Sequence, residues 1–86
     1  MKYRIELSRQ AKKSLARMHP KDQKSARERL LELETEPRKK STALSGQFAG
    51  LRKNRDGNVR IVFYLHDDEL IVEVENNLYR GSSYKR

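Results

Sequence analysis

The sequence predicts an α+β domain in which a helical hairpin packs on one face of a mainly antiparallel, four-stranded sheet. Three observations predict this class: an alternating run near the start, two stretches with apolar residues at helical spacing, and an Asp-Gly turn between strand-like runs. The order of elements is β-α-α-β-β-β, without an internal repeat. We expect the 86 residues to form one domain over 1–86, with a tail at 77–86 that is only partly ordered.

The first strand and first helix follow from residues 2–19. Residues 2–7 alternate charged and apolar side chains, and the apolar set is Tyr3, Ile5 and Leu7. Ser8 is expected to cap a helix that begins at Arg9. This helix should end near His19, because the residue before a proline avoids the α-helical region.

A second helix is expected between two prolines. Pro20 suits the first turn of a helix, and Pro37 ends it. Apolar residues at helical spacing predict the buried faces of both helices. They are Ala11, Leu15 and Met18 in the first helix, and Ala26, Leu30 and Leu33 in the second, with Leu31 beside them.

The second half of the chain predicts a basic loop and three strands. The loop covers 37–50, with Leu44 and Phe48 expected to anchor it to the core. Strands are expected at 51–56, 59–65 and 70–76, with a hairpin turn at Asp56-Gly57-Asn58. One face of the middle strand is apolar and should meet the helices: Val59, Ile61, Phe63 and Leu65. His66 is expected in a solvated acidic turn.

Positive charge is concentrated in the middle of the chain. The formal net charge is +8, and residues 38–60 contain seven Lys or Arg against one acidic residue. Such a segment is typical of a surface that meets phosphates or an acidic protein. Residues 1–37 mix both signs on helices, so we interpret their charges as solvated.

The composition also excludes several classes of protein. The chain has no cysteine, which excludes disulfides and thiolate zinc sites. It has no apolar run long enough to cross a bilayer and no signal-peptide core, so we expect no membrane partner and a cytoplasmic location.

The ordered set of residues resembles the RelE/ParE toxin superfamily of toxin–antitoxin modules. The resemblance rests on segments that span nearly the whole chain: Tyr3-Arg4-Ile5, Ala11 and Leu15, Glu36-Pro37-Arg38, Leu44-Ser45-Gly46, the run from Gly50 to Phe63, and Arg80-Gly81-Ser82-Ser83-Tyr84. RelE-type members are mRNA interferases that cut messenger RNA in the ribosomal A site. They do so through the RNA's own 2′-hydroxyl, without a metal or another cofactor.

The resemblance implies the site residues and the partners. It places the catalytic positions on Lys53, Arg55, Arg60, Arg80 and Tyr84. It also implies a cognate acidic antitoxin, the ribosome and mRNA as partners. Two departures from the family pattern are Val59, where a tyrosine is common, and Tyr79, which stands in place of a histidine and disfavours a histidine-dependent variant.

Two other functions fit the same residues. ParE-type members share the fold but poison DNA gyrase, and they usually lack the complete set of site residues. A basic nucleic-acid-binding module without catalysis is the third alternative. The complete set favours the RelE-type function.

The chemistry of RNA cleavage suits these residue types. A proton must be taken from the 2′-hydroxyl, charge on the phosphorane stabilised, and a proton given to the leaving oxygen. Lys53 is the candidate proton acceptor, because the neighbouring cations Arg55 and Arg60 disfavour its charged form. Arg80 would donate to the leaving oxygen, and Tyr84 would stack on a base.

Strand parity predicts where these side chains point. If Val59 and Ile61 face the helices, Arg60 lies on the open face of the sheet, and Lys53 and Arg55 must join it there. Arg52 has the opposite parity and is left out of the candidate site. Leu51 shares the parity of Lys53, which either a bulge or the start of the strand would explain.

Overall fold

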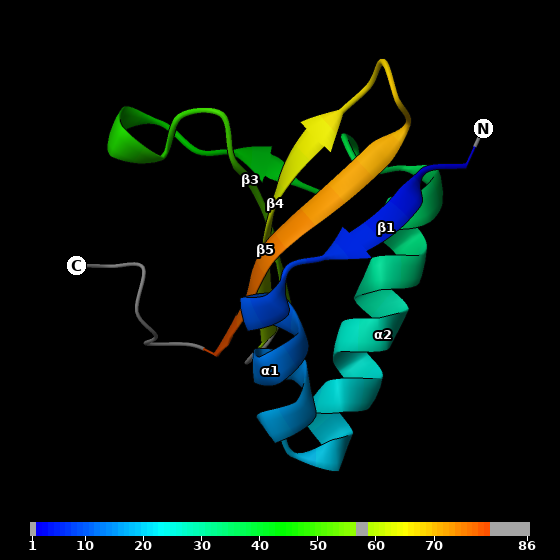
Figure 1. Ribbon diagram of the computed structural model, residues 1–86, viewed down its shortest axis with the longest axis vertical. Helices are drawn as coiled ribbons and strands as arrows, with labels where there is room; N and C mark the ends of the chain where they lie inside the picture. The colour runs from blue at the N-terminus through cyan, green and yellow to red at the C-terminus, as the bar shows by residue number, and fades with distance from the viewer. Residues whose placement is uncertain (1, 57–58, 80–86) are drawn as a thin grey trace.

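Five strands form one sheet in the order β1-β5-β4-β3-β2 in the computed structural model, which describes residues 2–56 and 59–79 (Figure 1). The strand β1 runs parallel to β5, and the other neighbours are antiparallel. The strands are β1 (Arg4–Leu7), β2 (Thr42–Ala43), β3 (Arg52–Asp56), β4 (Val59–His66) and β5 (Ile71–Tyr79). The predicted fold class is therefore confirmed. The short β2, inside the expected basic loop, adds one strand to the four predicted.

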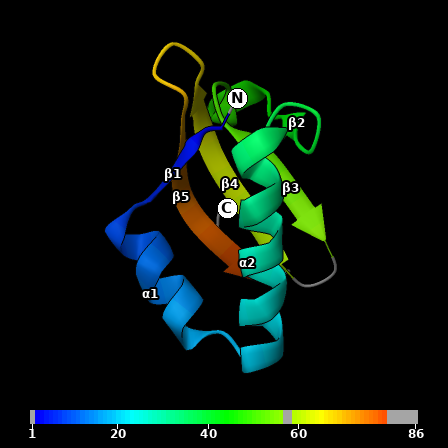
Figure 2. The same cartoon turned by 90° about the vertical axis from the view of Figure 1, so that its right-hand side faces the viewer.

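Two helices form a hairpin that packs on one face of this sheet (Figures 1 and 2). They are α1 (Arg9–Arg17) and α2 (Pro20–Thr35), and a short 3-10 turn, η1 (Gly46–Phe48), follows β2. Pro20 occupies the first turn of α2, as predicted. His19 lies outside α1 and caps α2, its Nδ1 accepting the Lys21 N–H at 3.2 Å.

Ser8 ties the start of α1 to the sheet. Its Oγ accepts the Ala11 N–H at 3.0 Å, which is the predicted N-cap. The same hydroxyl donates to the carbonyl of Glu75 in β5 at 2.7 Å. Glu75 is an extra residue in β5, since Val62 pairs with Asn76 and Phe63 with Val74. The bulge thus provides the acceptor that positions the first turn of α1.

The core lies between the helical hairpin and the sheet, on the faces that the apolar patterns predict. Helix residues and strand residues contribute to one buried cluster: Ala11, Met18, Ala26, Leu33, Val59, Ile61, Phe63, Val72 and Val74. Leu15 and Leu30 pack against it and are partly buried. Leu31 does not belong to the core, because 61% of its surface is exposed.

The C-terminal strand runs further than expected. Its last residue, Tyr79, pairs with Val59 of β4, so residues 77–79 belong to β5 rather than to the tail. Arg80 and Tyr84, both predicted site residues, lie outside the residues that the structure describes.

Candidate nucleic-acid interface

The register of β3 against β4 brings three of the predicted site residues to one face of the sheet. Arg55 pairs with Arg60, and Lys53 pairs with Val62. Directly opposed residues of an antiparallel pair project to the same face, with Cβ atoms about 4.5–5.5 Å apart. Because Val59, Ile61 and Phe63 face the helices, these three cations occupy the open face. Leu51 lies just before β3, so the start of the strand, and not a bulge, accounts for its parity.

The opposed pair of arginines is unfavourable for the fold by itself. Like charges directly across a sheet destabilise it. Arg55 is exposed and Arg60 is half-buried. Local features that weaken a fold are concentrated at functional sites, so this pair makes the open face the candidate functional surface.

An apolar floor and an aromatic ring continue the same face beyond the cations. Val62 has the parity of Arg60 and only 4% of its surface is exposed, yet it lies outside the core cluster. Tyr64 follows with 38% of its surface exposed. The alternation along β4 placed Tyr64 on the same face as Arg60 and Val62, but the sequence did not single it out as a candidate site residue.

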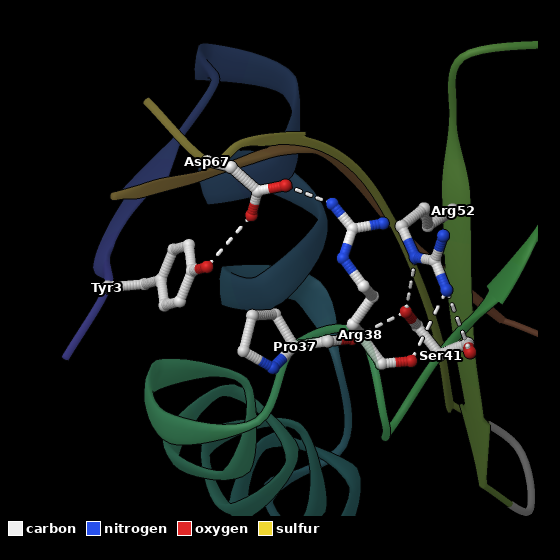
Figure 3. Close-up of polar contacts among 6 residues, drawn as sticks. All are labelled: Tyr3, Pro37, Arg38, Ser41, Arg52 and Asp67. Atoms are coloured by element: carbon white, nitrogen blue, oxygen red, sulfur yellow. Dashed lines mark hydrogen bonds and ion pairs between the residues drawn. The ribbon is translucent and has the colours of Figure 1, made fainter. Parts of the chain in front are cut away.

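Arg52 points to the other face and has a structural role. It pairs with the buried Phe63, and its Nε donates to Ser41 Oγ at 2.7 Å (Figure 3). Its Nη2 donates to the carbonyls of Arg38 and Ser41 at 3.3 Å each. These bonds hold the turn after α2 against β3, which agrees with the exclusion of Arg52 from the site.

A second polar group joins three distant segments of the chain (Figure 3). Tyr3 Oη donates to one oxygen of Asp67 at 2.8 Å, and Arg38 pairs with the other oxygen. The hydrogen bonds from Tyr3 and Arg38 hold the pKa of Asp67 below its ordinary value. The hydrogen bond to Asp67 raises the pKa of Tyr3. The sequence did not indicate this contact, because no local pattern connects residues so far apart.

His66 differs from the expected position in a solvated turn. It is the last residue of β4, and its Nε2 lies 2.7 Å from Glu73 Oε1 across the strand pair. In β5, burial and then the nearby charge of Glu73 raise the pKa of Glu75.

Among residues 2–56 and 59–79, no group of three or more histidine, aspartate or glutamate side chains is placed to bind a metal ion. Within the same residues, no helix has the length and apolar character needed to span a bilayer.

The fold has close structural relatives, although no family profile and no curated protein matches the sequence. A chain of the RelBE2 toxin–antitoxin complex of Mycobacterium tuberculosis superposes with a TM-score of 0.88 and 21% identity, over 93% of this chain and 100% of that one. The isolated RelE toxin of E. coli superposes with a TM-score of 0.79 and 19% sequence identity, over 95% of this chain and 88% of that one. A chain of the archaeal RelE–RelB complex of Pyrococcus horikoshii superposes with a TM-score of 0.74 and 21% sequence identity, over 96% of this chain and 100% of that one.

These likenesses define the class of fold. The helical hairpin on one face of a largely antiparallel sheet is the architecture that these RelE toxin structures share with this chain. Within that class, the similar structures are RelE toxins and RelB–RelE complexes. The chain therefore has the RelE-type fold that its sequence resembles.

Proposed function

We propose that this chain is the toxin of a type II toxin–antitoxin module, and that it is a ribosome-dependent endoribonuclease that cuts mRNA in the A site. The observation that carries the proposal is the β3–β4 register, which gathers Lys53, Arg55 and Arg60 on the open face of a RelE-type fold. The sequence resemblance contributes Arg80 and Tyr84, which stay predictions.

Cleavage would use the RNA's own 2′-hydroxyl as the nucleophile. Lys53 would take the proton from the 2′-hydroxyl while the 2′-oxygen forms a bond to phosphorus. Arg55 and Arg60 would stabilise the charge on the phosphorane, as preorganised cations do in phosphoryl transfer. The bond from phosphorus to the 5′-oxygen then breaks, a water molecule gives that oxygen a proton while Arg80 donates a hydrogen bond to it, and a 2′,3′-cyclic phosphate remains.

The ribosome would supply the orientation that such a site lacks. Holding reacting groups in place accounts for a large part of many catalytic barriers. Tyr84 would stack on a base of the A-site codon. This role requires a cytoplasmic location, where translation occurs.

The inhibitory partner would be a cognate acidic antitoxin. The net charge of +8 and the seven cations in residues 38–60 favour an acidic protein. Several structures with this fold are complexes of a RelE toxin with its RelB antitoxin, which supports the same kind of partner here.

The test is the fate of mRNA in a translating extract to which the purified protein is added. We expect cuts within codons, and Arg60→Ala should lower the rate of cutting by roughly 100- to 1,000-fold, the effect of removing one preorganised donor. Arg27→Ala is the matched control: it removes an exposed arginine from α2 and should leave the rate unchanged.

Two outcomes would contradict the proposal. Intact mRNA together with gyrase-dependent cleavage of supercoiled DNA would favour the ParE-type function. If the Arg60→Ala variant folds normally and cuts mRNA at the wild-type rate, the open face takes no part in the reaction.

A further inference from the structure

We propose that Tyr64, with His66 behind it, is a platform on which a nucleobase stacks while the adjoining phosphates contact the cations of β3 and β4. The inference rests on the proposed function, since it identifies how single-stranded nucleic acid lies on the open face. It adds two residues that the resemblance does not assign.

The position of Tyr64 in the register is the first argument. It has the same parity as Arg60 and Val62, so its ring belongs to the open face. Lys53 pairs with Val62 and is therefore the diagonal neighbour of Tyr64, at about 7–8 Å between Cα atoms. Arg60 lies four residues away along β4, about 13 Å at the rise of an extended strand. A few nucleotides span this distance.

The ring of Tyr64 is exposed and supported at the same time. It has 38% of its surface exposed, while a Cβ atom at Gly50 would lie 3.7 Å from its Cε1. The backbone at Gly50 therefore approaches the edge of the ring. The loop that carries η1 projects on the side of the sheet opposite α2 (Figure 1), so it borders the platform. A supported ring loses little conformational freedom when a base stacks on it.

His66 extends the aromatic surface. Its ring centroid lies 6.4 Å from that of Tyr64, with 37° between the planes. The contact of 2.7 Å with Glu73 holds the imidazole in this position. Two neighbouring rings on one strand present a surface that fits a base of any identity, because every base has a π-face.

The distribution of charge orients a strand of RNA across the face. Lys53, Arg55 and Arg60 attract phosphates to one end. Glu73 pairs with Tyr64 across the sheet at the other end, and repels them. A base, which carries no net charge, suits the acidic end, and the backbone suits the cationic end. Between them, the buried Val62 offers an apolar floor.

The absence of tryptophan from the chain gives a direct test, because Tyr64→Trp introduces a single reporter fluorophore. A short adenosine oligoribonucleotide should quench its emission on binding, whereas the same oligonucleotide without bases should bind through its phosphates and quench little. Leu31→Trp is the matched control: it lies on an exposed part of α2, and its emission should not respond.

The second measurement is the affinity for the labelled oligonucleotides, determined by fluorescence anisotropy. It compares three proteins: the wild type and the single variants Tyr64→Phe and Tyr64→Leu. Tyr64→Phe should keep the wild-type affinity for the adenosine oligonucleotide. Tyr64→Leu should weaken it roughly 5- to 150-fold, the equivalent of about 1–3 kcal/mol per stacked base. The affinity for the baseless oligonucleotide should be equal in all three proteins, which separates stacking from damage to the fold.

The outcomes distinguish this inference from the proposed function. If the adenosine oligonucleotide binds to the Tyr64→Trp variant without quenching its emission, or if Tyr64→Leu binds as tightly as wild type, the platform is wrong and the cationic site stands. If neither oligonucleotide binds at low salt, the open face is no site for single-stranded RNA, and the platform and the proposed mechanism both fail.

Discussion

Asp67 is a residue whose contacts join segments that lie far apart along the chain. It accepts hydrogen bonds from Tyr3, just before β1, and from Arg38, after α2, while it lies in the turn between β4 and β5 itself. These charge-assisted contacts form only in the folded state, so they lower the pKa of the carboxyl group there. The contribution of Asp67 to stability must therefore depend on pH.

We expect Asp67→Asn to lower the thermal midpoint at pH 7. The folded-state pKa of Asp67 lies below its unfolded value, so its stabilising effect is present above the unfolded pKa and is lost as the pH falls through the folded one. The difference between wild type and variant should thus shrink below about pH 4. Circular dichroism melts at about pH 7 and about pH 3 measure it. Asp68→Asn, the exposed neighbour, is the control, and an equal effect of both substitutions would contradict the argument.

Within the elements, α2 shows how sharply burial separates adjacent leucines. Leu33 is fully buried in the core, while Leu31, two positions away, is 61% exposed. The helical period of 3.6 residues places Leu30 and Leu33 on one face and turns Leu31 toward its edge. The amphipathic pattern of the sequence was enough to place the face but not its border.

We expect Leu33→Ala to reduce the free energy of unfolding by about 2–5 kcal/mol, because it leaves a cavity against the sheet. Leu31→Ala should change it by less than about 0.5 kcal/mol, as surface substitutions do. Urea denaturation followed by circular dichroism compares the two. Equal losses would mean that Leu31 is covered in solution by another surface.

Most elements were predictable because their ends carry chemical signals. Ser8, Pro20 and Pro37 mark the ends of the helices. The register of β3 against β4 is the one expected for the predicted hairpin, although Gly57 and Asn58 of its turn lie outside the described residues. That register is also why parity alone gathered Lys53, Arg55 and Arg60 on one face, with Arg52 on the other.

Other features depend on contacts between distant segments and have no local signal. The strand β2 has two exposed residues, and only its pairing with Lys53 and Arg52 defines it. The bond between His66 and Glu73 required the β4–β5 register. Tyr64 is a different case, since its alternation with Arg60 and Val62 along β4 already placed it on the open face, and the structure adds that 38% of its surface is exposed there.

Across the whole molecule, charge is divided between two surfaces of different kinds. The helices carry mixed charges of both signs, whereas the open face gathers cations on adjacent strands. If the chain binds RNA as proposed, the cations of the open face would release counterions from its backbone, whereas the mixed charges of the helices would not. The position of a cation should therefore matter more than its contribution to the net charge.

We expect Lys53→Ala to reduce the salt dependence of RNA binding. For single strands, each phosphate contact contributes about 0.7 to the slope of log affinity against log salt. The variant should lose roughly that amount, while Lys24→Ala, which removes the same charge from the exposed surface of α2, should keep the wild-type slope. Anisotropy titrations at several salt concentrations give the slopes. Identical slopes for the two variants would show that binding follows net charge alone.

The parallel pairing of β1 with β5 also has a consequence for synthesis. The ribosome makes β1 early, at about 5–20 residues per second, but the residues that β1 pairs with, Ile71 to Val74, come late in the chain. The carbonyl of Glu75 that positions Ser8 emerges later still. A nascent chain thus keeps β1 and the cap of α1 without partners for several seconds, and such non-local pairings form slowly. The complete sheet, and with it the support behind the open face, arises only when the last strand has left the ribosome.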